Sequence, residues 1–163
     1  MGFQKIDMLV MDIDGSLTDG KIYMGEHGEV MKAFDIKDGY AIYHMLPQNG
    51  IVPVVITGRT SAIVENRCRE LKIEEIHQGC LDKEGKIIEI AQRHGLEFSS
   101  DGKLCKCAYF GDDLIDLPAM KLVEVIGCPS DAAKQVKEMA TYICERAGGA
   151  GALREFVEWL LEI

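Results

Sequence analysis

The chain has 163 residues, a formal net charge of −9, 47% hydrophobic residues and 28% charged residues, as in ordinary globular proteins. This length predicts a single domain over residues 1–163. Neither a nucleic-acid nor a membrane partner is expected, because no basic run and no stretch of about 20 apolar residues occurs.

A buried strand is the first predicted element, and it ends at two aspartates. The apolar run Met8–Met11 leads directly into Asp12 and Asp14, and such a run before turn residues suits a parallel strand covered on both faces. Ligands of open α/β sheets bind beyond the carboxyl ends of the strands, so both aspartates are candidate functional residues. No signal peptide is recognised before them, and the cytoplasm is therefore the expected compartment.

The next predicted elements are a hairpin and a helix. Two alternating apolar and polar runs flank residues 25–28, which predicts a β-hairpin over about residues 20–34. Asp38 is then expected to cap a helix that Pro47 and Gly50 bring to an end.

The rest of the chain alternates predicted strands and predicted helices. The strands are expected over residues 51–57, 74–79, 107–110, 123–127 and 141–144. The helices are expected over residues 60–73, 82–95, 117–120, 132–140 and 151–162. This alternation predicts an α/β, Rossmann-like parallel sheet with helices on both faces and the hairpin as an insertion. Among the six cysteines only Cys105 and Cys107 lie close in sequence, without ligands at zinc spacing, so reduced thiols are expected.

The tail of the chain begins with a glycine-rich run. Three glycines fall between residues 148 and 151, and an amphipathic segment follows. We interpret the glycines as a hinge and residues 151–162 as a docking helix, because neither the hairpin nor this tail has an obvious place within its own sheet.

Oxygen-bearing side chains follow three predicted strands at their carboxyl ends. They are Asp12 and Asp14, Thr57, and Asp112, Asp113 and Asp116. If these strands are neighbours, the carboxylates converge with only Arg59 and Lys83 as compensating charges. Carboxylates so close raise one another's pKa or require a cation. Oxygen ligands favour Mg²⁺, and a Mg²⁺ site with few carboxylates leaves room for a substrate phosphate.

In this order, the stretches resemble the motifs of the haloacid dehalogenase superfamily of phosphotransferases. The matching sequences are DIDGSLTDG, TGR, HQGCLDK and GDDLIDLPAM. The hairpin KIYMGEHGEVMKAF, the following FDIKDGYAI and the final GGAGALREFVEWLL extend the resemblance over nearly the whole chain. They are most similar to the small branch containing 3-deoxy-D-manno-octulosonate 8-phosphate phosphatase. The spacing of the motifs leaves no room for the cap domain that larger members insert.

The resemblance implies a catalytic or phosphate-binding role for five residues. Asp12 would be the nucleophile that forms an aspartyl-phosphate, and Asp14 would protonate the leaving alkoxide and then activate water. Thr57 and the backbone of Gly58 would hold the phosphoryl oxygens. Lys83 would neutralise those oxygens and orient Asp12.

The resemblance also implies Mg²⁺ as the cofactor. The ion would be bound by the Asp12 carboxylate, the Asp14 backbone carbonyl and Asp112. Asp113 or Asp116 would support it through water or as a partner of a ligand. A carboxylate nucleophile needs such a cation, because the charge of a phosphate dianion otherwise repels it.

Two arginines are candidates for binding a substrate carboxylate. Arg59 directly follows the phosphate-binding residues, and Arg67 lies about two turns further along the same predicted helix. The alternative for both is a simple ion pair with Glu65 or Glu70. A carboxylate-binding arginine fits phosphates of 2-keto-3-deoxy sugar acids. The resemblance favours the eight-carbon acid, because Arg59 is similar to that group and not to the nine-carbon phosphatases; a nine-carbon acid 9-phosphate stays open as an alternative.

The resembled branch also implies an assembly. Its hairpins form a central barrel in a homotetramer, and its tail reaches toward a neighbouring active site, so both are expected here. A different possibility is a catalytically idle tetrameric scaffold or regulatory domain. The presence of every catalytic motif and the absence of a fused partner domain favour the enzyme.

Overall fold

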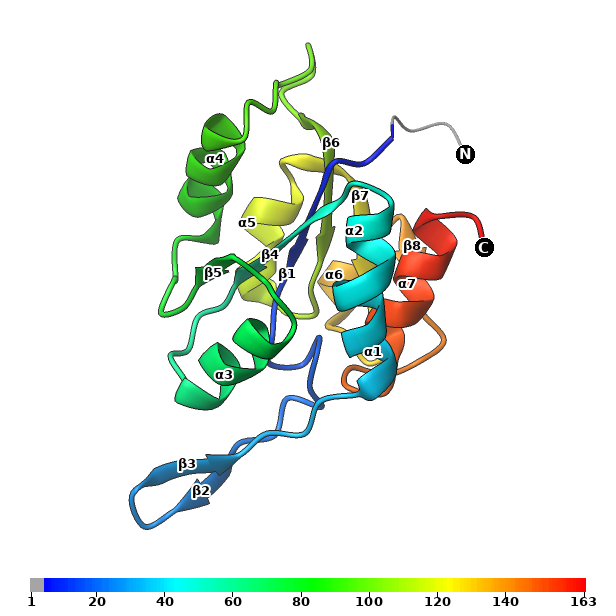
Figure 1. Ribbon diagram of the computed structural model, residues 1–163. Helices are drawn as coiled ribbons and strands as arrows, with labels where there is room; N and C mark the ends of the chain where they lie inside the picture. The colour runs from blue at the N-terminus through cyan, green and yellow to red at the C-terminus, as the bar shows by residue number, and fades with distance from the viewer. Residues whose placement is uncertain (1–4) are drawn as a thin grey trace.

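A parallel sheet forms the centre of the computed structural model, which describes residues 5–163 (Figure 1). In this part of the chain the sheet has six strands in the order β5-β4-β1-β6-β7-β8, and all neighbouring pairs are parallel. The strands are β1 Met8–Met11, β4 Val52–Ile56, β5 Glu75–His77, β6 Leu104–Phe110, β7 Val123–Cys128 and β8 Tyr142–Ile143. The predicted Rossmann-like α/β fold is confirmed.

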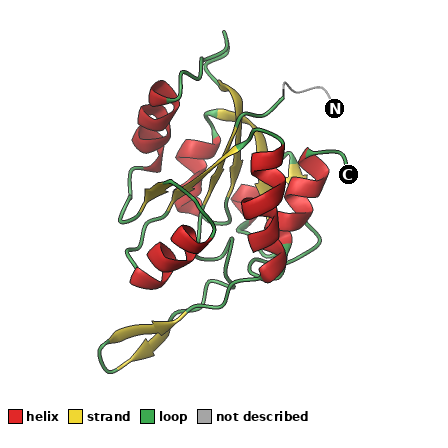
Figure 2. Cartoon of the chain, in the orientation of Figure 1, coloured by secondary structure: helices red, strands yellow, loops and turns green. Residues whose placement is uncertain are grey.

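Helices cover both faces of the sheet (Figure 2). They are α1 Ile36–Tyr40, the π-helical turn η1 Ala41–Met45, α2 Leu46–Gln48, α3 Ala62–Glu70, α4 Lys83–Arg93, the 3₁₀ turn η2 Leu114–Asp116, α5 Leu117–Met120, α6 Lys134–Met139 and α7 Ala152–Leu160. Alternate side chains of β1 enter two separate cores. Leu9 and Met11 pack with η1, α3 and α7, whereas Met8 and Val10 pack with α4, α5 and α6. No helix among residues 5–163 combines the length and apolar character needed to cross a membrane.

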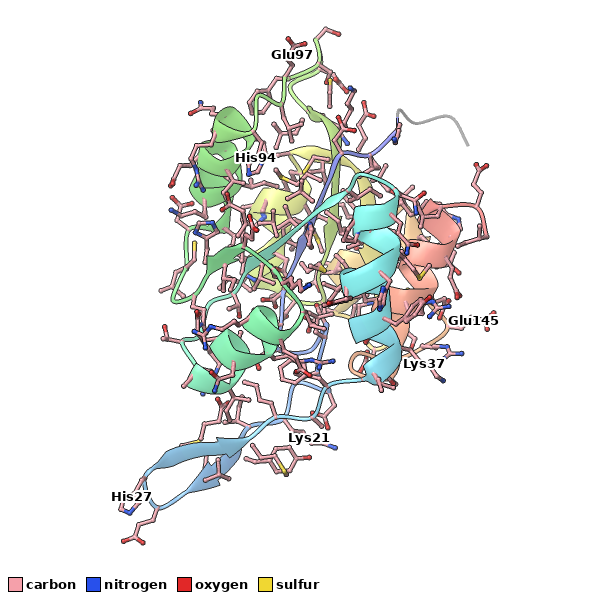
Figure 3. All side chains as sticks on the ribbon, in the orientation of Figure 1. Lys21, His27, Lys37, His94, Glu97 and Glu145 are labelled. Atoms are coloured by element: carbon pink, nitrogen blue, oxygen red, sulfur yellow. The ribbon has the colours of Figure 1, made fainter. Side chains whose placement is uncertain are left out.

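The predicted hairpin leaves the body of the molecule as a separate two-stranded sheet. Its strands are β2 Tyr23–Gly25 and β3 Gly28–Met31, which lie within the predicted residues 20–34. Figure 3 shows His27 at its tip, away from the sheet. Met24, Val30 and Met31 are 65%, 63% and 51% exposed, so the hairpin carries uncovered apolar side chains.

The helix after the hairpin ends at Gln48, before Gly50 as predicted, but its cap and the place of Pro47 differ from the prediction. Asp35, and not Asp38, caps α1, because its side chain accepts a 2.7 Å hydrogen bond from the backbone N–H of Lys37. Pro47 does not end the helix. The π-helical turn η1 changes the backbone hydrogen-bond pattern, so that α2 begins at Leu46 and Pro47 lies in its first turn. There the missing N–H of proline costs little stability, because first-turn N–H groups have no partner within the helix.

Asp38 caps a different helix, far away in the sequence. Its buried carboxylate accepts a 2.9 Å hydrogen bond from the backbone N–H of Arg154, in the first turn of α7. Gly151, at the N-cap position of α7, has no side chain with which to do this. Sequence spacing within the first helix could not reveal a cap supplied across the fold.

The tail helix α7 is part of the core, so the prediction that the tail has no place within its own sheet is wrong. Leu153, Phe156 and Val157 are fully buried, and the ring of Phe156 fills the space over Gly127 of β7, where a Cβ would lie 2.4 Å from it. Helical periodicity predicts that one face of a helix is apolar, but it does not say which surface covers that face.

The glycine-rich run before α7 is a close contact and not a free hinge. A Cβ on Gly148 would lie 1.9 Å from the carbonyl oxygen of Gly15, in the loop after Asp14. The backbone N–H of Gly149 donates a 3.2 Å hydrogen bond to the carbonyl of Ser16 in the same loop. The run therefore supports the loop that carries the predicted acid/base residue.

Candidate active site

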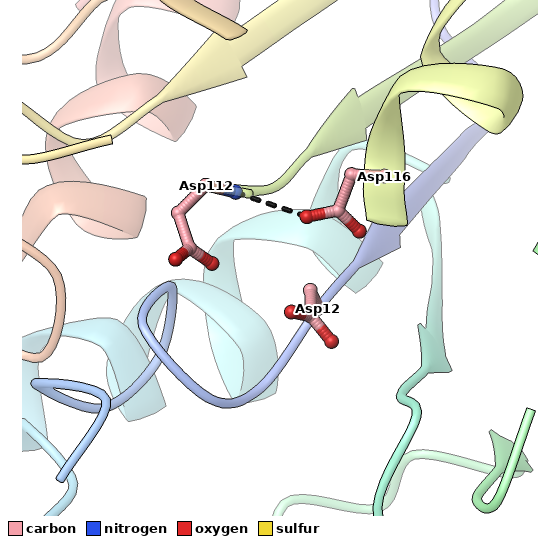
Figure 4. A group of neighbouring side chains, drawn as sticks. All are labelled: Asp12, Asp112 and Asp116. Carbon is pink, nitrogen blue, oxygen red and sulfur yellow. Dashed lines mark hydrogen bonds between the residues drawn. The ribbon is translucent and has the colours of Figure 1, made fainter. Parts of the chain in front are cut away.

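Three aspartates come together at the carboxyl edge of the sheet. β1 lies between β4 and β6, so the residues that follow these strands meet, as the sequence predicted. Carboxylate oxygens of Asp12, Asp112 and Asp116 lie within 4.8 Å of one another (Figure 4). Burial, together with the charge of Asp116, raises the pKa of Asp12 to about 6. The cluster therefore carries more negative charge than its surroundings readily stabilise.

Lys83 supplies the cation nearest to Asp12. It is the first residue of α4, which begins there because the Asp82 side chain accepts a 2.9 Å hydrogen bond from the N–H of Gly85. Its ammonium group lies 2.8 Å from Asp12 Oδ1 and 2.7 Å from Asp116 Oδ1. Burial alone would lower the pKa of Lys83, but the two carboxylates outweigh burial and raise it. Lys83 is thus a charged anchor for Asp12, in the predicted position.

Asp116 is committed to hydrogen bonds with the protein. Its Oδ1 accepts from Lys83 and, at 2.8 Å, from the hydroxyl of Tyr109. Its Oδ2 accepts from the backbone N–H groups of Asp112 at 3.1 Å and Asp113 at 3.2 Å. Four donors leave little lone-pair density for an ion. We therefore place Asp116 in support of the cluster, although its oxygens lie near those of Asp12 and Asp112.

Asp113 lies away from this cluster. Its side chain is exposed and accepts a 2.8 Å hydrogen bond from the N–H of Leu114, which caps the turn η2. A capping role explains an aspartate at this position without a ligand. Of the two predicted supporting residues, Asp116 is therefore the one beside Asp12.

Asp112 is the second carboxylate with ligand character. Its Oδ1 accepts a 2.8 Å hydrogen bond from the hydroxyl of Ser16. Gly15 is required beside it, because a Cβ there would lie 2.0 Å from Asp112 Oδ2. Burial and the neighbouring aspartates raise its pKa to about 7, against the hydrogen bond from Ser16.

The donor set of the cluster fits a hard divalent cation. Asp12 is a buried and Asp112 a half-buried oxygen donor, both with raised pKa values, and one ammonium group cannot balance three carboxylates. Oxygen ligands of this kind suit Mg²⁺ better than softer metals. These residues therefore have the chemistry of a cation site.

The side chain of Asp14 belongs to a different group of charges. Its Oδ1 accepts a hydrogen bond from the ammonium group of Lys32, which follows β3 of the hairpin. Its Oδ2 lies 3.8 Å from Nε of Arg59. The carboxylate of Asp14 is thus held on the hairpin side of the site, apart from the charges around Asp12.

Thr57 and Gly58, the residues predicted to bind phosphate, follow β4 at the carboxyl edge of the sheet. Thr57 follows β4, is 2% exposed and donates its N–H to the carbonyl of His77 at 2.9 Å. Leu81 and Ile115 border Gly58, since a Cβ there would lie 3.7 Å and 3.4 Å from their side chains. A small residue is compatible with a ligand approaching this backbone.

The two predicted substrate-binding arginines differ in their surroundings. Arg59 is half exposed, and its guanidinium lies 3.8 Å from Asp14 and from Glu29, beyond hydrogen-bond distance. Arg67 instead forms a 2.9 Å ion pair with Glu70, as the alternative interpretation held. Arg59 is therefore the better placed of the two for an anionic ligand.

Sequence reasoning missed several residues of this site. Lys32 and Glu29 were assigned to the hairpin alone, and the hydroxyls of Ser16 and Tyr109 were not singled out. The contacts of Lys32 with Asp14, of Glu29 with Ser61 and of Ser16 with Asp112 span 18, 32 and 96 residues, which no local spacing encodes. The contact of Tyr109 with Asp116 spans only 7 residues.

Known proteins similar to this chain were found by sequence and by structure, whereas a scan against protein-family models found no match. The chain is 39% identical over 158 residues to 3-deoxy-D-manno-octulosonate 8-phosphate phosphatase KdsC of Salmonella typhi, covering 97% of this chain and 80% of that protein. It is 38% identical to the protein of the same name from Escherichia coli K12, with the same coverage.

Solved structures agree with the sequence relatives. The phosphatase of this name from Moraxella catarrhalis, crystallised with magnesium, phosphate and KDO, matches with a TM-score of 0.87 and 38% identity, covering 96% of this chain and 86% of that one. The cobalt-bound phosphatase from Haemophilus influenzae matches with a TM-score of 0.87 and 32% identity, covering 97% and 88%. The chain belongs to the 3-deoxy-D-manno-octulosonate 8-phosphate phosphatase family of the haloacid dehalogenase superfamily.

Proposed function

We propose that the protein is a magnesium-dependent phosphomonoesterase that converts 3-deoxy-D-manno-octulosonate 8-phosphate into the free sugar acid and phosphate. One observation carries the proposal. At the carboxyl ends of β1 and β6, Asp12, Asp112 and Asp116 lie together, and the ammonium group of Lys83 contacts both Asp12 and Asp116. The carboxylate of Asp12 is thus fixed beside the ammonium group of Lys83, in a protein that belongs to a phosphatase family.

The reaction proceeds in two steps at Asp12. One carboxylate oxygen of Asp12 attacks phosphorus, and the bond from phosphorus to the sugar oxygen breaks. Asp14 gives its proton to the departing alkoxide, so the sugar acid leaves as the alcohol. Asp14 then takes a proton from water, whose oxygen attacks phosphorus and releases Asp12 and inorganic phosphate.

The other residues position the phosphoryl group. Lys83 screens its charge and holds Asp12, while Thr57 and the N–H groups around Gly58 bind its oxygens. Asp12, Asp112 and the Asp14 carbonyl would hold the Mg²⁺, with Asp116 in support. When bound, Mg²⁺ neutralises charge on the phosphoryl oxygens.

The substrate carboxylate binds to Arg59 in this proposal. The half-exposed guanidinium has no hydrogen-bonded carboxylate in the part of the chain that the structure describes, so it can form a bidentate pair with a ligand. Arg67 is a secondary candidate, because its ion pair with Glu70 must break before it can bind the substrate. Removing the Arg59 charge should raise KM about 10- to 100-fold, the usual worth of a charged hydrogen bond.

We further propose that the protein works as a homotetramer in the cytoplasm. The exposed Met24, Val30 and Met31 of the hairpin support the assembly, since uncovered apolar side chains favour a protein partner. Six free cysteines suit a reducing compartment. The tail helix is held in its own core, so any reach toward a neighbouring active site falls to residues after Leu160.

A substrate panel tests the proposed function. Phosphate release is measured from the eight-carbon acid 8-phosphate, a nine-carbon keto-deoxy acid 9-phosphate and simple sugar phosphates, with Mg²⁺ or with EDTA. The eight-carbon substrate with Mg²⁺ should be preferred, and EDTA or Asp12→Asn should abolish its turnover. Preference for the nine-carbon acid would change the assigned substrate. No turnover of any phosphate would favour the idle scaffold.

A further inference from the structure

Lys32 is a buried lysine that the proposed reaction does not yet use. Its side chain is fully shielded from solvent, although it lies only one residue beyond β3 of an exposed hairpin. Its ammonium group donates to Oδ1 of Asp14 and lies 2.9 Å from Oε1 of Glu29. Burying an ammonium group and its carboxylate partners costs desolvation free energy that their attraction often only just offsets. The pairs of Lys32 are therefore not explained by added stability.

The carboxylate partner Glu29 is itself held from the body of the protein. Its Oε2 accepts a 2.5 Å hydrogen bond from the hydroxyl of Ser61, at the start of α3. The backbone N–H of Ser61 in turn donates to the side chain of Gln78 at 2.8 Å. Lys32 is therefore fixed from both sides, by Asp14 in the active-site loop and by Glu29 through Ser61.

Lys32 holds Asp14 through one carboxylate oxygen, Oδ1. Lys32 donates a hydrogen bond to Oδ1, whereas Nε of Arg59 lies 3.8 Å from Oδ2, beyond hydrogen-bond distance. The side chain of Asp14 is 18% exposed, so part of it is accessible to a ligand. A general acid needs such an arrangement, with one oxygen anchored and the other directed at the atom that receives the proton.

We propose that Lys32 is a positioning residue for Asp14, which holds Oδ1 so that Oδ2 delivers the proton to the leaving oxygen. This inference rests on the proposed phosphatase function. Without Lys32, the Asp14 carboxylate can turn toward Arg59 and form an ion pair with it. Arg59 would then be less available to bind the substrate carboxylate. Lys32 and Glu29 thereby make the hairpin part of the catalytic site.

A leaving-group series distinguishes positioning from a merely structural role. The variants Lys32→Met and Lys32→Gln are compared with wild type on phosphate esters without a carboxylate, from p-nitrophenyl phosphate through phenyl phosphate to an alkyl phosphate. The p-nitrophenolate ion departs without a proton, whereas an alkoxide needs one. Because kcat/KM covers the steps up to loss of the leaving group, it reports this proton transfer.

The loss of kcat/KM in the Lys32 variants should grow with the basicity of the leaving group. We expect a loss of less than about 3-fold with p-nitrophenyl phosphate and about 100-fold with the alkyl phosphate, within the usual range for general acid catalysis. Asp14→Asn should show the same trend, and the double variant Asp14→Asn with Lys32→Met should be no worse than Asp14→Asn alone.

Lys21→Met is the matched control on the same segment. Lys21 is labelled in Figure 3, at the base of the hairpin, and its side chain is 72% exposed beside Asp19. Its kcat/KM should equal that of wild type for every ester. Glu29→Gln keeps Lys32 and can still accept the hydrogen bond from Ser61, so we expect this variant to fold even if the Lys32 variants do not. Its kcat/KM should fall less than in the Lys32 variants, but the loss should again grow with the basicity of the leaving group.

Three results would overturn the inference. The first is an equal loss of kcat/KM on all esters in the Lys32 variants, and the second is no loss on any ester. The third is a folded Glu29→Gln protein whose loss of kcat/KM does not vary with the leaving group. A failure of the proposed function itself looks different, because wild type would then release no phosphate from any sugar-acid phosphate or ester.

Discussion

Nζ of Lys83 lies 2.8 Å from Oδ1 of Asp12, and these side chains are only 1% and 7% exposed. The contact joins the start of α4 to the end of β1. Without it, Asp12 and Asp116 would be neighbouring buried carboxylates with no cation between them. The pair therefore bears on both the stability of the site and the reactivity of the proposed nucleophile, Asp12.

Replacing Lys83 should remove activity and weaken the fold. In Lys83→Met we expect kcat to fall by at least about 100-fold, the usual cost of removing one preorganised cationic donor. The free energy of unfolding in EDTA should fall by about 3–5 kcal/mol, since one partner of a buried pair is lost. Lys86→Met, on the same helix, is the control, because Lys86 pairs with Glu89 near the surface and away from Asp12. Wild-type turnover by Lys83→Met would exclude Lys83 from catalysis.

The stability of the metal-free protein should decrease as the pH rises. Burial raises the pKa of Asp12 to about 6 and of Asp112 to about 7, from 3.8. Carboxyls with a raised pKa bind protons more tightly in the folded than in the unfolded state. In EDTA, the free energy of unfolding should therefore fall between about pH 4 and pH 7 and then level off.

Mg²⁺ should reverse this trend, because it binds the ionised carboxylates. At pH 8, Mg²⁺ at about 100 times its dissociation constant should add about 2.7 kcal/mol to the free energy of unfolding. At pH 5 the gain should be much smaller. Thermal unfolding across this pH range, with Mg²⁺ or EDTA, measures both effects, and Asp112→Asn should show a flatter pH dependence. An equal gain from Mg²⁺ at pH 5 and pH 8 would contradict the proposed ligands.

Adding a methyl group to Gly148 should disturb the catalytic loop. The new Cβ would lie 1.9 Å from the carbonyl oxygen of Gly15, so the loop that carries Asp14 must move. We expect Gly148→Ala to lower kcat at least 10-fold and stability by about 1–3 kcal/mol, as overpacking does. Ala150→Ser, at an exposed neighbouring position, should leave both unchanged. A fully active Gly148→Ala protein would mean that the loop tolerates this displacement.

Polar side chains on the hairpin should break the proposed tetramer. In the double variant Met24→Ser and Val30→Ser, the exposed apolar surface that supports assembly is reduced. Light scattering should give a tetramer for wild type and a smaller species for the variant. Its kcat should fall as well, because the hairpin carries Lys32. A monomeric wild type, or an unchanged tetramer in the variant, would refute this assembly.

The sequence by itself determined the sheet and the sites at its edge. Short apolar runs ending in Asp12, Thr57 and Asp112 predicted strands and functional groups together, because parallel strands place their carboxyl ends at one edge. The alternation of strands and helices predicted the α/β class. These features were readable because each depends on residues close together in the chain.

Tertiary structure alone decided which partners these groups have. The cap that Asp38 provides for α7, the packing of Phe156 over Gly127 and the burial of Lys32 between Asp14 and Glu29 each join distant segments. Local periodicity predicts that a face is apolar, and a motif predicts that a carboxylate is reactive. Which surface covers that face, and which cation holds that carboxylate, depends on three-dimensional packing that neighbouring residues in the chain do not encode.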